Sequence, residues 1–576
     1  MPTLNWIGKD KVVNHHLDVP FRVLEEQYTY GDNADGNMII HGDNLDALKA
    51  LLPQFEGRVK CIYIDPPYNT GNEGWVYNDN VNDPKIRKWL GEVVGREGED
   101  LSRHDKWLCM MYPRLKLLQK LLAEDGVIFI SIDDTEYANL KAICDEIFGL
   151  NCFVSNISWQ RTYSTRNDSK GIVNEVEHIL VYSKTPDWQP NKLPRTSEMD
   201  SRYKNPDNDI LPWKNTDAFA PSAATHQGMV YAIQHPFTGL LLYPANGRCW
   251  PLGQEQMLEI MQGWCDYELR NLHDEAYRAV VCGVSEDEIR RDVPAIVLSE
   301  PVDVASVKAQ AVYDRGQWPR FFFTRGGRGG IARKTYLEKV RGKLPTNFWS
   351  HTETGHTDEA KKEMLAIFDG RTTFDTPKPS RLIERILQVA SGSDSIILDS
   401  FAGSGTTAHA ILNTNKQDGG HRRFILVETE DYAENITAER VRRVINGYGE
   451  GNKAIAGTGG GFSFYELGAP LMIDGNLNPD VPETRIREYV YYTETKLPMP
   501  PVSEAEPHLL GVHNRAAYYF YYLPDAVTTL NEAFLRTIRT EADSYMIYAD
   551  INALDEATMK RHHITFKKIP RDITLL

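Results

Sequence analysis

The chain has 576 residues and a formal net charge of -16, and its content of 41% hydrophobic and 25% charged residues is typical of a folded globular protein of about two to four domains. Its seven cysteines form no Cys-x-x-Cys pair and no cluster with histidines, which argues against a metal site and a disulfide framework. The sequence shows neither a signal peptide nor an apolar stretch long enough to span a membrane, so we expect a cytoplasmic protein without membrane contact.

Strands and helices alternate after residue 40 and predict the first half of an α/β domain, residues 41–185. Residues 1–40 are expected to form an N-terminal extension. The predicted elements of this half are, in chain order, a helix at 44–52, a strand at 58–64, an amphipathic helix at 104–123, a strand at 127–132, and a pair of strands at 153–160 and 176–183.

The string Asp65-Pro66-Pro67-Tyr68 follows directly on the strand at 58–64. Open α/β sheets bind ligands at the carboxyl ends of their strands, so this position favours chemistry over a plain turn with Tyr68 in the core. The Asp65 carboxylate and the Pro66 carbonyl can both accept hydrogen bonds from a substrate amine, since proline itself donates none. Tyr68 offers a face for stacking. The string therefore predicts a site that aims an exocyclic amino group at an electrophile, mainly by positioning.

Residues 186–345 lack the α/β periodicity and are expected to form a separate domain. The stretch 185–215 is rich in Pro, Asn and Asp, and the stretch 254–308 is acidic and rich in helix signals. Between residues 314 and 343, nine basic residues stand against two acidic ones, with Trp and Phe interleaved. Such a run is either a solvated basic face or a contact with nucleic acid. The net negative charge of the chain opposes binding to phosphates, but this segment is positively charged. The predicted DNA contacts are Arg320, Arg325, Arg328, Arg333 and Lys334.

Residues 346–446 predict the second half of the α/β domain. The string Phe401-Ala402-Gly403-Ser404-Gly405-Thr406-Thr407 lies between a strand and a helix, and its glycines let the backbone approach a ligand closely. Glu428 ends the next strand and is placed to bind ribose hydroxyls. The string lacks the Gly-Lys-Ser/Thr ending of a P-loop, which argues against an NTPase. A dehydrogenase would leave the string at Asp65 unexplained. A tight turn in an ordinary βαβ unit is the alternative. The predicted elements are a helix at 380–390, a strand at 395–400, a helix at 406–412 and a strand at 424–427.

Glycine clusters at 447–452 and 457–461 predict a flexible joint, followed by a small C-terminal α/β module. Aromatic strands are expected there at 518–523, 544–548 and 563–567. The module, residues 447–576, contains no cluster of residues typical of catalysis.

Taken together, the strings at 65–71 and 401–407 resemble motifs IV and I of the amino-group DNA methyltransferases that use S-adenosylmethionine. Their order, catalytic before cofactor-binding, is similar to that of the circularly permuted β class. Further segments resemble the modification (Mod) subunits of type III restriction-modification systems, and the likeness runs from about residue 38 to 446; these segments are 41–44, 355–363, 374–379 and 420–424. The resemblance implies a Rossmann-like α/β sheet with an inserted target recognition domain, residues 186–345, and a C-terminal module.

Transferred residue by residue, the resemblance implies that Asp65 binds the target amine of a flipped base. Asp43 would contact the adenine of the cofactor, Lys378 would lie near its methionine carboxylate, and Glu428 would hold its ribose. The expected catalytic residues are Asp65, Pro66, Pro67 and Tyr68. The expected residues that bind S-adenosylmethionine are Asp43, Asp65, Lys378, Asp399, Phe401, Ala402, Gly403, Ser404, Gly405, Thr406 and Glu428.

An Asp at the head of motif IV is typical of N6-adenine enzymes, whereas N4-cytosine enzymes mostly carry Ser there, so adenine is the preferred target. The resemblance also implies double-stranded DNA as substrate, a homodimer, and a helicase-nuclease restriction subunit as partner. Three alternatives stay open: an N4-cytosine enzyme, an RNA methyltransferase with the same pocket, and a DNA-recognition scaffold for a helicase-nuclease.

Overall fold

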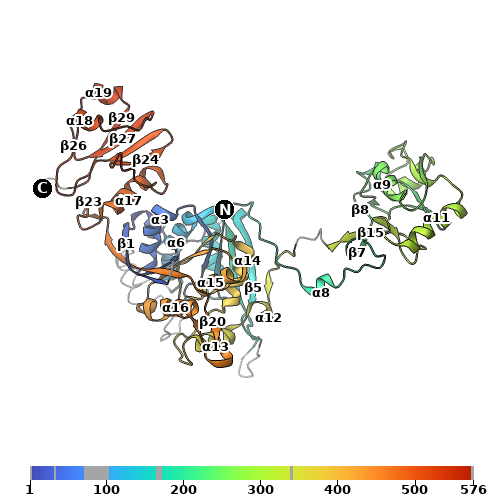
Figure 1. Ribbon diagram of the computed structural model, residues 1–576, viewed down its shortest axis with the longest axis horizontal. Helices are drawn as coiled ribbons and strands as arrows, with labels where there is room; N and C mark the ends of the chain where they lie inside the picture. The colour runs from blue at the N-terminus through green and yellow to red at the C-terminus, as the bar shows by residue number, and fades with distance from the viewer. Residues whose placement is uncertain are drawn as a thin grey trace. The chain divides into compact units, whose positions relative to one another are not determined.

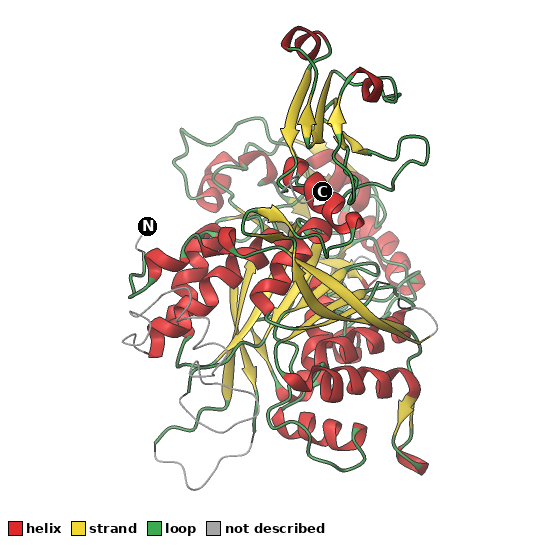
Figure 2. Cartoon of the chain, turned by 90° about the vertical axis from the view of Figure 1, so that its left-hand side faces the viewer, coloured by secondary structure: helices red, strands yellow, loops and turns green. Residues whose placement is uncertain are grey.

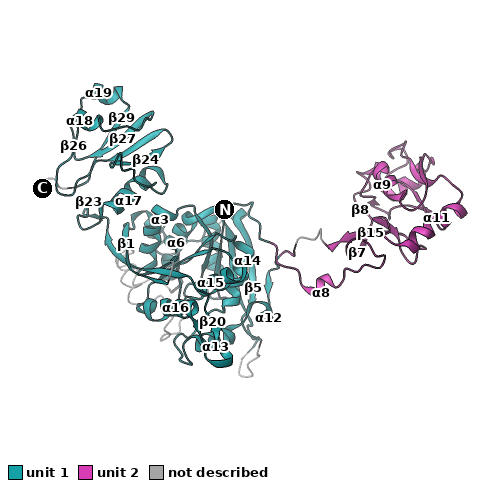
Figure 3. Ribbon diagram, viewed as in Figure 1, with its two compact units in different colours: residues 1–191, 345–576 teal, residues 192–344 magenta. Residues whose placement is uncertain are grey.

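The computed structural model describes residues 3–31, 34, 36–70, 103–163, 171–337 and 342–571. The chain forms two compact units, residues 1–191 with 345–576 and residues 192–344, shown in teal and magenta in Figure 3. None of the helices in the described ranges is long and apolar enough to span a bilayer. Within the same ranges, no group of three or more His, Cys, Asp and Glu side chains is arranged to hold a metal ion.

The larger unit contains a ten-stranded mixed sheet (Figure 1). From one edge to the other, its strands are β1 (Arg22–Gly31), β21 (Gly461–Pro470), β2 (Met38–His41), β18 (Arg423–Glu428), β17 (Ile396–Asp399), β3 (Val59–Ile64), β4 (Leu122–Ile132), β6 (Val176–Ser183), β5 (Phe153–Gln160) and β16 (Phe348–Trp349). Its main helices are α3 (Asn44–Phe55), α6 (Arg103–Leu121), α7 (Tyr137–Phe148), α13 (Thr357–Ile367), α14 (Ser380–Ala390), α15 (Thr406–Asp418) and α16 (Glu439–Asn446).

Helices lie on both faces of this sheet (Figure 2), and the chain direction explains how they are divided. Helix α3 connects β2 to β3 and α6 connects β3 to β4, both toward the β16 edge. Helix α15 connects β17 to β18 in the opposite direction. Because such crossovers are right-handed, α3 and α6 cover one face and α15 the other.

Strands β3 and β17 are adjacent and parallel, with Ile397 opposite Cys61. The connection after β3 leads toward the β16 edge of the sheet and the connection after β17 leads toward the β1 edge, so the order of the strands reverses between them. A crevice forms where helices leave two neighbouring parallel strands toward opposite faces, and this is where α/β sheets bind ligands. Asp65 follows β3 and Phe401 follows β17 closely in the chain. The topology therefore brings the two strings singled out in the sequence to one crevice.

The strands at the centre of the sheet are buried on both faces, as their apolar sequences require. Strand β17 has four buried residues out of four, and β18 has five out of six. The predicted ranges of the helices and strands in both halves agree with the observed ones to within a few residues, and the longest difference is α15, which extends to Asp418.

Two domain boundaries expected from the sequence differ from the structure. Residues 22–31 and 38–41, expected in an N-terminal extension, form β1 and β2 of the large sheet. Residues 461–470, expected in the C-terminal module, form β21, which runs antiparallel to β1 and parallel to β2. These pairings join segments more than 400 residues apart, and a local sequence pattern carries no information about such distant partners.

Beyond β21 the chain forms helix α17 (Glu483–Thr495) and a four-stranded sheet. One side of this sheet shares a core with α17 and the other packs on the short helices α18 (Glu532–Leu535) and α19 (Glu556–Arg561). Its strands are β24 (Leu509–His513), β25 (Ala516–Phe520), β27 (Ser544–Ala549) and β29 (Ile564–Lys568).

The smaller unit consists of short strands and helices with a core rich in aromatic residues, among them Trp250 and Trp264. Its strands are six residues or fewer, which explains why the sequence showed no sheet periodicity there. The acidic stretch 254–308 contains α9 (Gln254–Met261), β12 (Tyr267–Arg270), α10 (Glu275–Cys282), β13 (Ala295–Leu298) and the start of α11 (Val302–Arg315). One sheet of this unit joins β14 (Phe321–Phe323), β15 (Ile331–Tyr336) and β7 (Trp213–Asp217).

Candidate active site

A pocket with about 280 Å³ of empty volume, open to solvent, lies at the crevice between β3 and β17. It combines aromatic rings, hydroxyl groups, two carboxyl groups and one ammonium group. Its lining residues are Tyr63, Asp65, Phe374, Thr376, Pro377, Lys378, Asp399, Phe401, Ala402, Gly403, Ser404, Thr406 and Thr407. The pocket thus unites Asp65 with most of the glycine string, from segments more than 300 residues apart.

Asp65 is held by two neighbours that come from different parts of the chain. Lys378 Nζ donates to both carboxylate oxygens, at 2.8 and 2.7 Å, and Tyr68 Oη donates to Oδ1 at 2.8 Å. Burial raises the pKa of Asp65, whereas Lys378 and Tyr68 act to lower it. Lys378 therefore favours the ionised form of Asp65, which is the form that accepts hydrogen bonds from an amine.

Glu177 on β6 also faces Asp65 and Tyr68, and it was not among the residues predicted from the sequence. Its Oε2 lies 3.3 Å from Tyr68 Oη and 3.8 Å from Lys378 Nζ, while its Oε1 accepts from Arg161 at 2.8 Å. Strand β6 pairs with β4, next to β3, so the sheet order brings it beside the site. A lone Glu inside an apolar strand is the signal that could have identified it, because a buried charge requires partners.

The backbone after Asp65 is fixed by side chains from two helices. The Pro67 carbonyl accepts a hydrogen bond from Trp107 Nε1 of α6 at 2.6 Å. Asn69, in the left-handed conformation with φ of 59°, donates to the buried Glu136. Pro66 is buried beside them. Gly71, the last residue of this string, lies outside the described residues. These contacts hold the string rigid, as a site that acts by positioning requires.

The glycine string makes the turn from β17 to α15. Gly403 and Gly405 have φ angles of 51° and 80°, a region that side chains with a Cβ rarely adopt. The Gly403 amide donates to Glu428 Oε2 at 2.7 Å, and the amide of Glu430 donates to Oε1 of the same carboxyl at 3.0 Å. Burial raises the pKa of Glu428 to about 7, although both amides favour its ionised form. Glu428 thus supports the turn from the end of β18.

Asp399, the last residue of β17, also supports the glycine string. Its carboxylate accepts from the amide of Phe401 at 3.1 Å and from the hydroxyl of Thr407 at 2.5 Å. Burial raises the pKa of Asp399 to about 7. The two ends of the glycine string are therefore tied to one buried carboxyl.

Asp43 lies at the N-terminus of α3 and acts as its N-cap. Its Oδ1 accepts from the amides of Leu45 at 2.8 Å and Asp46 at 3.2 Å. The neighbouring Asn44 donates to the Ser400 carbonyl at 3.0 Å, which links this helix end to the glycine string. Asp43 Oδ2 accepts from Nη2 of Arg114 on α6 at 3.3 Å, so Asp43 both caps α3 and pairs with a buried cation. Neither Asp43 nor Glu428 is among the residues that line the pocket as described.

The basic residues of the smaller unit do not share one environment. Arg320, Arg325 and Arg328 are exposed around the β14–β15 hairpin, and Arg333 is half-buried on β15. Lys334 is fully buried and forms ion pairs with Asp207 and, at 2.6 Å, with Asp209. The prediction that Lys334 contacts DNA is therefore corrected, because its ammonium group neutralises two carboxylates inside the unit.

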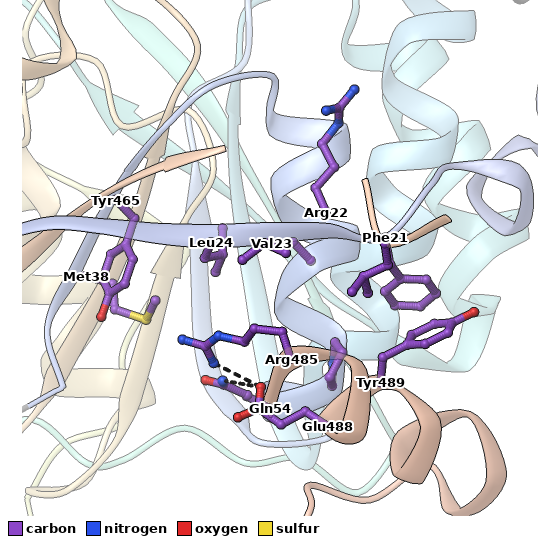
Figure 4. A pocket seen from close by; sticks show the side chains of 13 residues that line it. Phe21, Arg22, Val23, Leu24, Met38, Gln54, Tyr465, Arg485, Glu488 and Tyr489 are labelled. Carbon is purple, nitrogen blue, oxygen red and sulfur yellow. Dashed lines mark hydrogen bonds and ion pairs between the residues drawn. The ribbon is translucent and has the colours of Figure 1, made fainter. Parts of the chain in front are cut away.

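A second pocket lies between β1, α3, β21 and α17 (Figure 4). Apolar side chains such as Phe21, Leu24 and Tyr489 line it. Glu488 accepts hydrogen bonds from Arg485 at 2.9 Å and from Gln54 at 3.5 Å across its rim. None of the motif residues predicted from the sequence lines this pocket.

Comparison with known proteins identifies related chains. The model of the N6/N4 DNA methylase family, described as "DNA methylase", matches residues 59–238 and 252–439. The StyLTI Mod subunit, a type III restriction-modification protein of Salmonella typhimurium strain LT2, is 32% identical over 451 residues, which are 75% of this chain and 59% of the relative. The EcoP15I Mod subunit of Escherichia coli is 29% identical and covers 74% of this chain and 64% of its own. The chain thus spans about 60% of the length of these relatives.

Other similar proteins include the type II methyltransferase M.KpnI of Klebsiella pneumoniae, 28% identical over 69% of this chain and 81% of its own. Among solved structures, the PvuII cytosine-N4-specific DNA methyltransferase has a TM-score of 0.33 and 12% identity, over 71% of this chain and 89% of that one. A Thermus thermophilus protein described as a putative DNA modification methylase, complexed with S-adenosylmethionine, has a TM-score of 0.30 and 13% identity, over 75% of this chain and 99% of that one.

Proposed function

The chain belongs to the N6/N4 DNA methylase family, and we propose that it transfers a methyl group from S-adenosylmethionine to the N6 amino group of adenine in double-stranded DNA. One observation carries the proposal. Asp65 of the amine-binding string and every residue of the glycine string except Gly405 line one pocket between β3 and β17. The amine acceptor and the cofactor-binding turn are thereby within reach of each other.

S-adenosylmethionine is the methyl donor of this family, and the residues of the pocket fit its chemical groups. Phe401 and Phe374 offer rings for a purine, and Ser404 and Thr406 offer hydroxyl groups. Lys378 supplies an ammonium group for a carboxylate, and the turn at Gly403 and Gly405 lets the backbone approach. When bound, the cofactor supplies an electrophilic methyl group on a sulfonium sulfur.

The residues around Asp65 can position the target amine without acting as a strong base. In this proposal an ionised Asp65 accepts one N–H of the amino group and localises the nitrogen lone pair, and the Pro66 carbonyl accepts the second. Lys378 favours the ionised form of Asp65 against the effect of burial, since it donates to both carboxylate oxygens. Tyr68 lies next to Asp65 and provides the ring for stacking. Positioning and fixed dipoles of this kind account for much of the rate enhancement in group transfer.

We assign the smaller unit, residues 192–344, to target recognition. An adenine inside a duplex has to be extruded, at a cost of a few kcal/mol, before its amino group can enter a pocket. The exposed Arg320, Arg325 and Arg328 supply positive charge for phosphates on a unit inserted between the two halves of the catalytic domain.

The similarity to Mod subunits extends the proposal to a type III restriction-modification system. A second copy of the chain and a helicase-nuclease restriction subunit would then be the partners. The part beyond β21 has its own cores around α17 and the four-stranded sheet, which makes it the region we assign to such contacts.

Single-molecule sequencing of genomic DNA from cells that express the chain tests target and chemistry together. We expect N6-methyladenine at one short sequence motif, and no modification in cells that express Asp65→Ala at the same level. N4-methylcytosine at a motif would show that the target base is cytosine and not adenine. Unmodified DNA in both cultures would refute DNA methylation by this chain.

A further inference from the structure

An ion pair between the buried Arg440 and the partly exposed Glu363 lies behind the glycine string, and none of the site assignments above includes it. Arg440 is on α16 and its side chain is fully buried, while Glu363 is on α13. Arg440 Nη2 lies 3.0 Å from Glu363 Oε2. Burying a guanidinium is costly unless its N–H groups find partners, so the partners of Arg440 show which part of the fold it serves.

The other contacts of Arg440 point to the cofactor pocket. Its Nη1 donates to Ser404 Oγ at 2.9 Å and to Thr406 Oγ1 at 2.8 Å. Both hydroxyl groups belong to residues that line the pocket. A planar guanidinium with two donors on one nitrogen fixes the two hydroxyls relative to each other, which a flexible ammonium group does not do.

Glu363 extends the same network toward Lys378. Its Oε1 accepts from the hydroxyl of Ser380, two residues after Lys378, at 2.5 Å. The Thr406 hydroxyl also lies 3.3 Å from the Lys378 carbonyl. One ion pair therefore links the turn that carries Ser404 and Thr406 to the segment that delivers Lys378 to Asp65.

Two neighbours complete the arrangement. Thr437 lies three residues before Arg440, on the same face of the helical segment, and its hydroxyl donates to the Gly403 carbonyl at 2.6 Å. His409 Nδ1 lies 3.1 Å from Arg440 Nη2, and burial lowers the pKa of His409 to about 4. The imidazole is thus neutral near pH 7 and accepts a hydrogen bond from Arg440, which leaves Arg440 as the cation that pairs with Glu363.

We propose that Arg440 and Glu363 form a positioning pair that sets the geometry of Ser404, Thr406 and Lys378 for cofactor binding. Neither residue lines the pocket, so the pair acts through these three residues. The inference rests on the proposed methyl transfer, since it assigns the network to the binding of S-adenosylmethionine.

Calorimetric titration of S-adenosylmethionine into the full chain tests the pair. We expect Arg440→Met to raise the Kd at least tenfold, because both hydroxyls lose their common donor. Arg440→Lys keeps the charge without the fork, and Glu363→Gln keeps the shape without the charge, so both should raise the Kd by about threefold to tenfold. In steady-state methylation, the same variants should raise the KM for S-adenosylmethionine and leave the KM for DNA unchanged.

Arg487→Met is the matched control. Arg487 is also buried and bonded, to the Leu509 carbonyl at 3.1 Å and to Glu483, but it lies on α17. Its replacement should lower the melting temperature and change the Kd by less than twofold. If Arg440→Lys and Glu363→Gln, the variants that preserve most of the packing, bind with wild-type affinity, the positioning role is overturned. A wild-type chain that does not bind S-adenosylmethionine would instead refute the proposed function and, with it, this inference.

Discussion

The two units differ in how the position of a charged residue in the sequence relates to its position in the fold. In the larger unit, Asp65 and Lys378 are 313 positions apart in the chain, yet they meet in one pocket at distances of 2.7 and 2.8 Å. In the smaller unit, Arg328 and Lys334 are six positions apart, yet Arg328 is exposed and Lys334 is fully buried.

The difference shows which sequence patterns determine the location of a side chain. Asp65 follows β3 at the edge of the sheet where the ends of adjacent parallel strands meet, and the segment before α14 carries Lys378 to the same edge. A run of basic residues along a short antiparallel hairpin alternates between solvent and core, so its net charge does not tell which cations are available to a ligand. The following experiments test this contrast.

The largest effect is expected for Asp65→Ala. Loss of the carboxylate that would hold the amine should reduce methylation of double-stranded DNA by roughly 10²–10⁴-fold, in the range of other positioned catalytic groups. Transfer of a labelled methyl group measures the rate, and calorimetry should show that binding of S-adenosylmethionine largely persists. Asp125→Ala, which removes an exposed carboxylate from the same half of the domain, should be fully active. Turnover retained by Asp65→Ala would exclude the catalytic assignment.

Lys334→Met should destabilise the smaller unit by about 3–5 kcal/mol, because it leaves Asp207 and Asp209 without their buried cation. Chemical denaturation followed by tryptophan fluorescence measures the change, since the core of this unit contains Trp250 and Trp264. Arg328→Ala on the same hairpin is the control and should change the stability by less than about 0.5 kcal/mol. Equal stabilities for the two variants would contradict the contrast between buried and exposed cations.

Glu428 should make the larger unit less stable as pH rises. Burial raises its pKa to about 7 in the folded chain, against about 4.3 in an unfolded one. Between these values the folded state binds more protons than the unfolded state, so the contribution of this group to stability falls as pH increases. Relative to Glu428→Gln, the wild-type chain should lose about 1–3 kcal/mol of unfolding free energy between pH 4.5 and 7.5.

Denaturant titrations of both proteins across this pH range provide the measurement for Glu428. Glu124→Gln, which removes an exposed carboxyl, should run parallel to the wild type at all pH values. A constant difference between the wild type and Glu428→Gln would show that Glu428 has the same proton affinity in both states.

Phe401→Ala should weaken the binding of S-adenosylmethionine by about tenfold, which corresponds to ~1.4 kcal/mol of lost contact with a ring that lines the pocket. Phe348→Ala removes an exposed ring from β16 and should bind like the wild type. Unchanged affinity in Phe401→Ala would refute the cofactor role of this residue.

The smallest effects are expected for the exposed arginines of the hairpin. Arg325→Ala and Arg328→Ala should each lower the affinity for double-stranded DNA about twofold to fivefold and reduce the salt dependence by about one released ion. Fluorescence anisotropy at several salt concentrations measures both quantities. Arg202→Ala, an exposed arginine of the same unit outside the hairpin, controls for loss of charge. An unchanged slope would remove the hairpin from the DNA interface.

For the fold, local periodicity predicted the elements that build the centre of the sheet, because strands buried on both faces are continuously apolar and their helices are amphipathic. It did not predict that β1 and β21 complete the sheet, since Phe462 and Phe464 find their partners more than 400 residues away. Strands as short as β14 and β16 left no periodic signal at all.

For the site, Asp65 and the glycine string were identifiable because their residue types are unusual at a strand end. Arg440 was not, since charged residues are ordinary within an amphipathic helix, and Glu177 offered only the weaker signal of a charge within a largely apolar strand. Their roles follow from neighbours that only the folded chain provides.

By itself, the sequence determined which strings could form the site, since Asp65-Pro66-Pro67-Tyr68 and the glycine string are local patterns of residue types. The tertiary structure alone decided which charges serve it. Sheet order brought Glu177 to Asp65, and the segment before α14 brought Lys378 there. Helix packing placed Arg440 behind the glycine string, whereas Lys334 pairs with two carboxylates in the core of the smaller unit. The physical reason is that burial and pairing depend on partners remote in the chain, and these determine whether a charge binds a ligand or stabilises the fold.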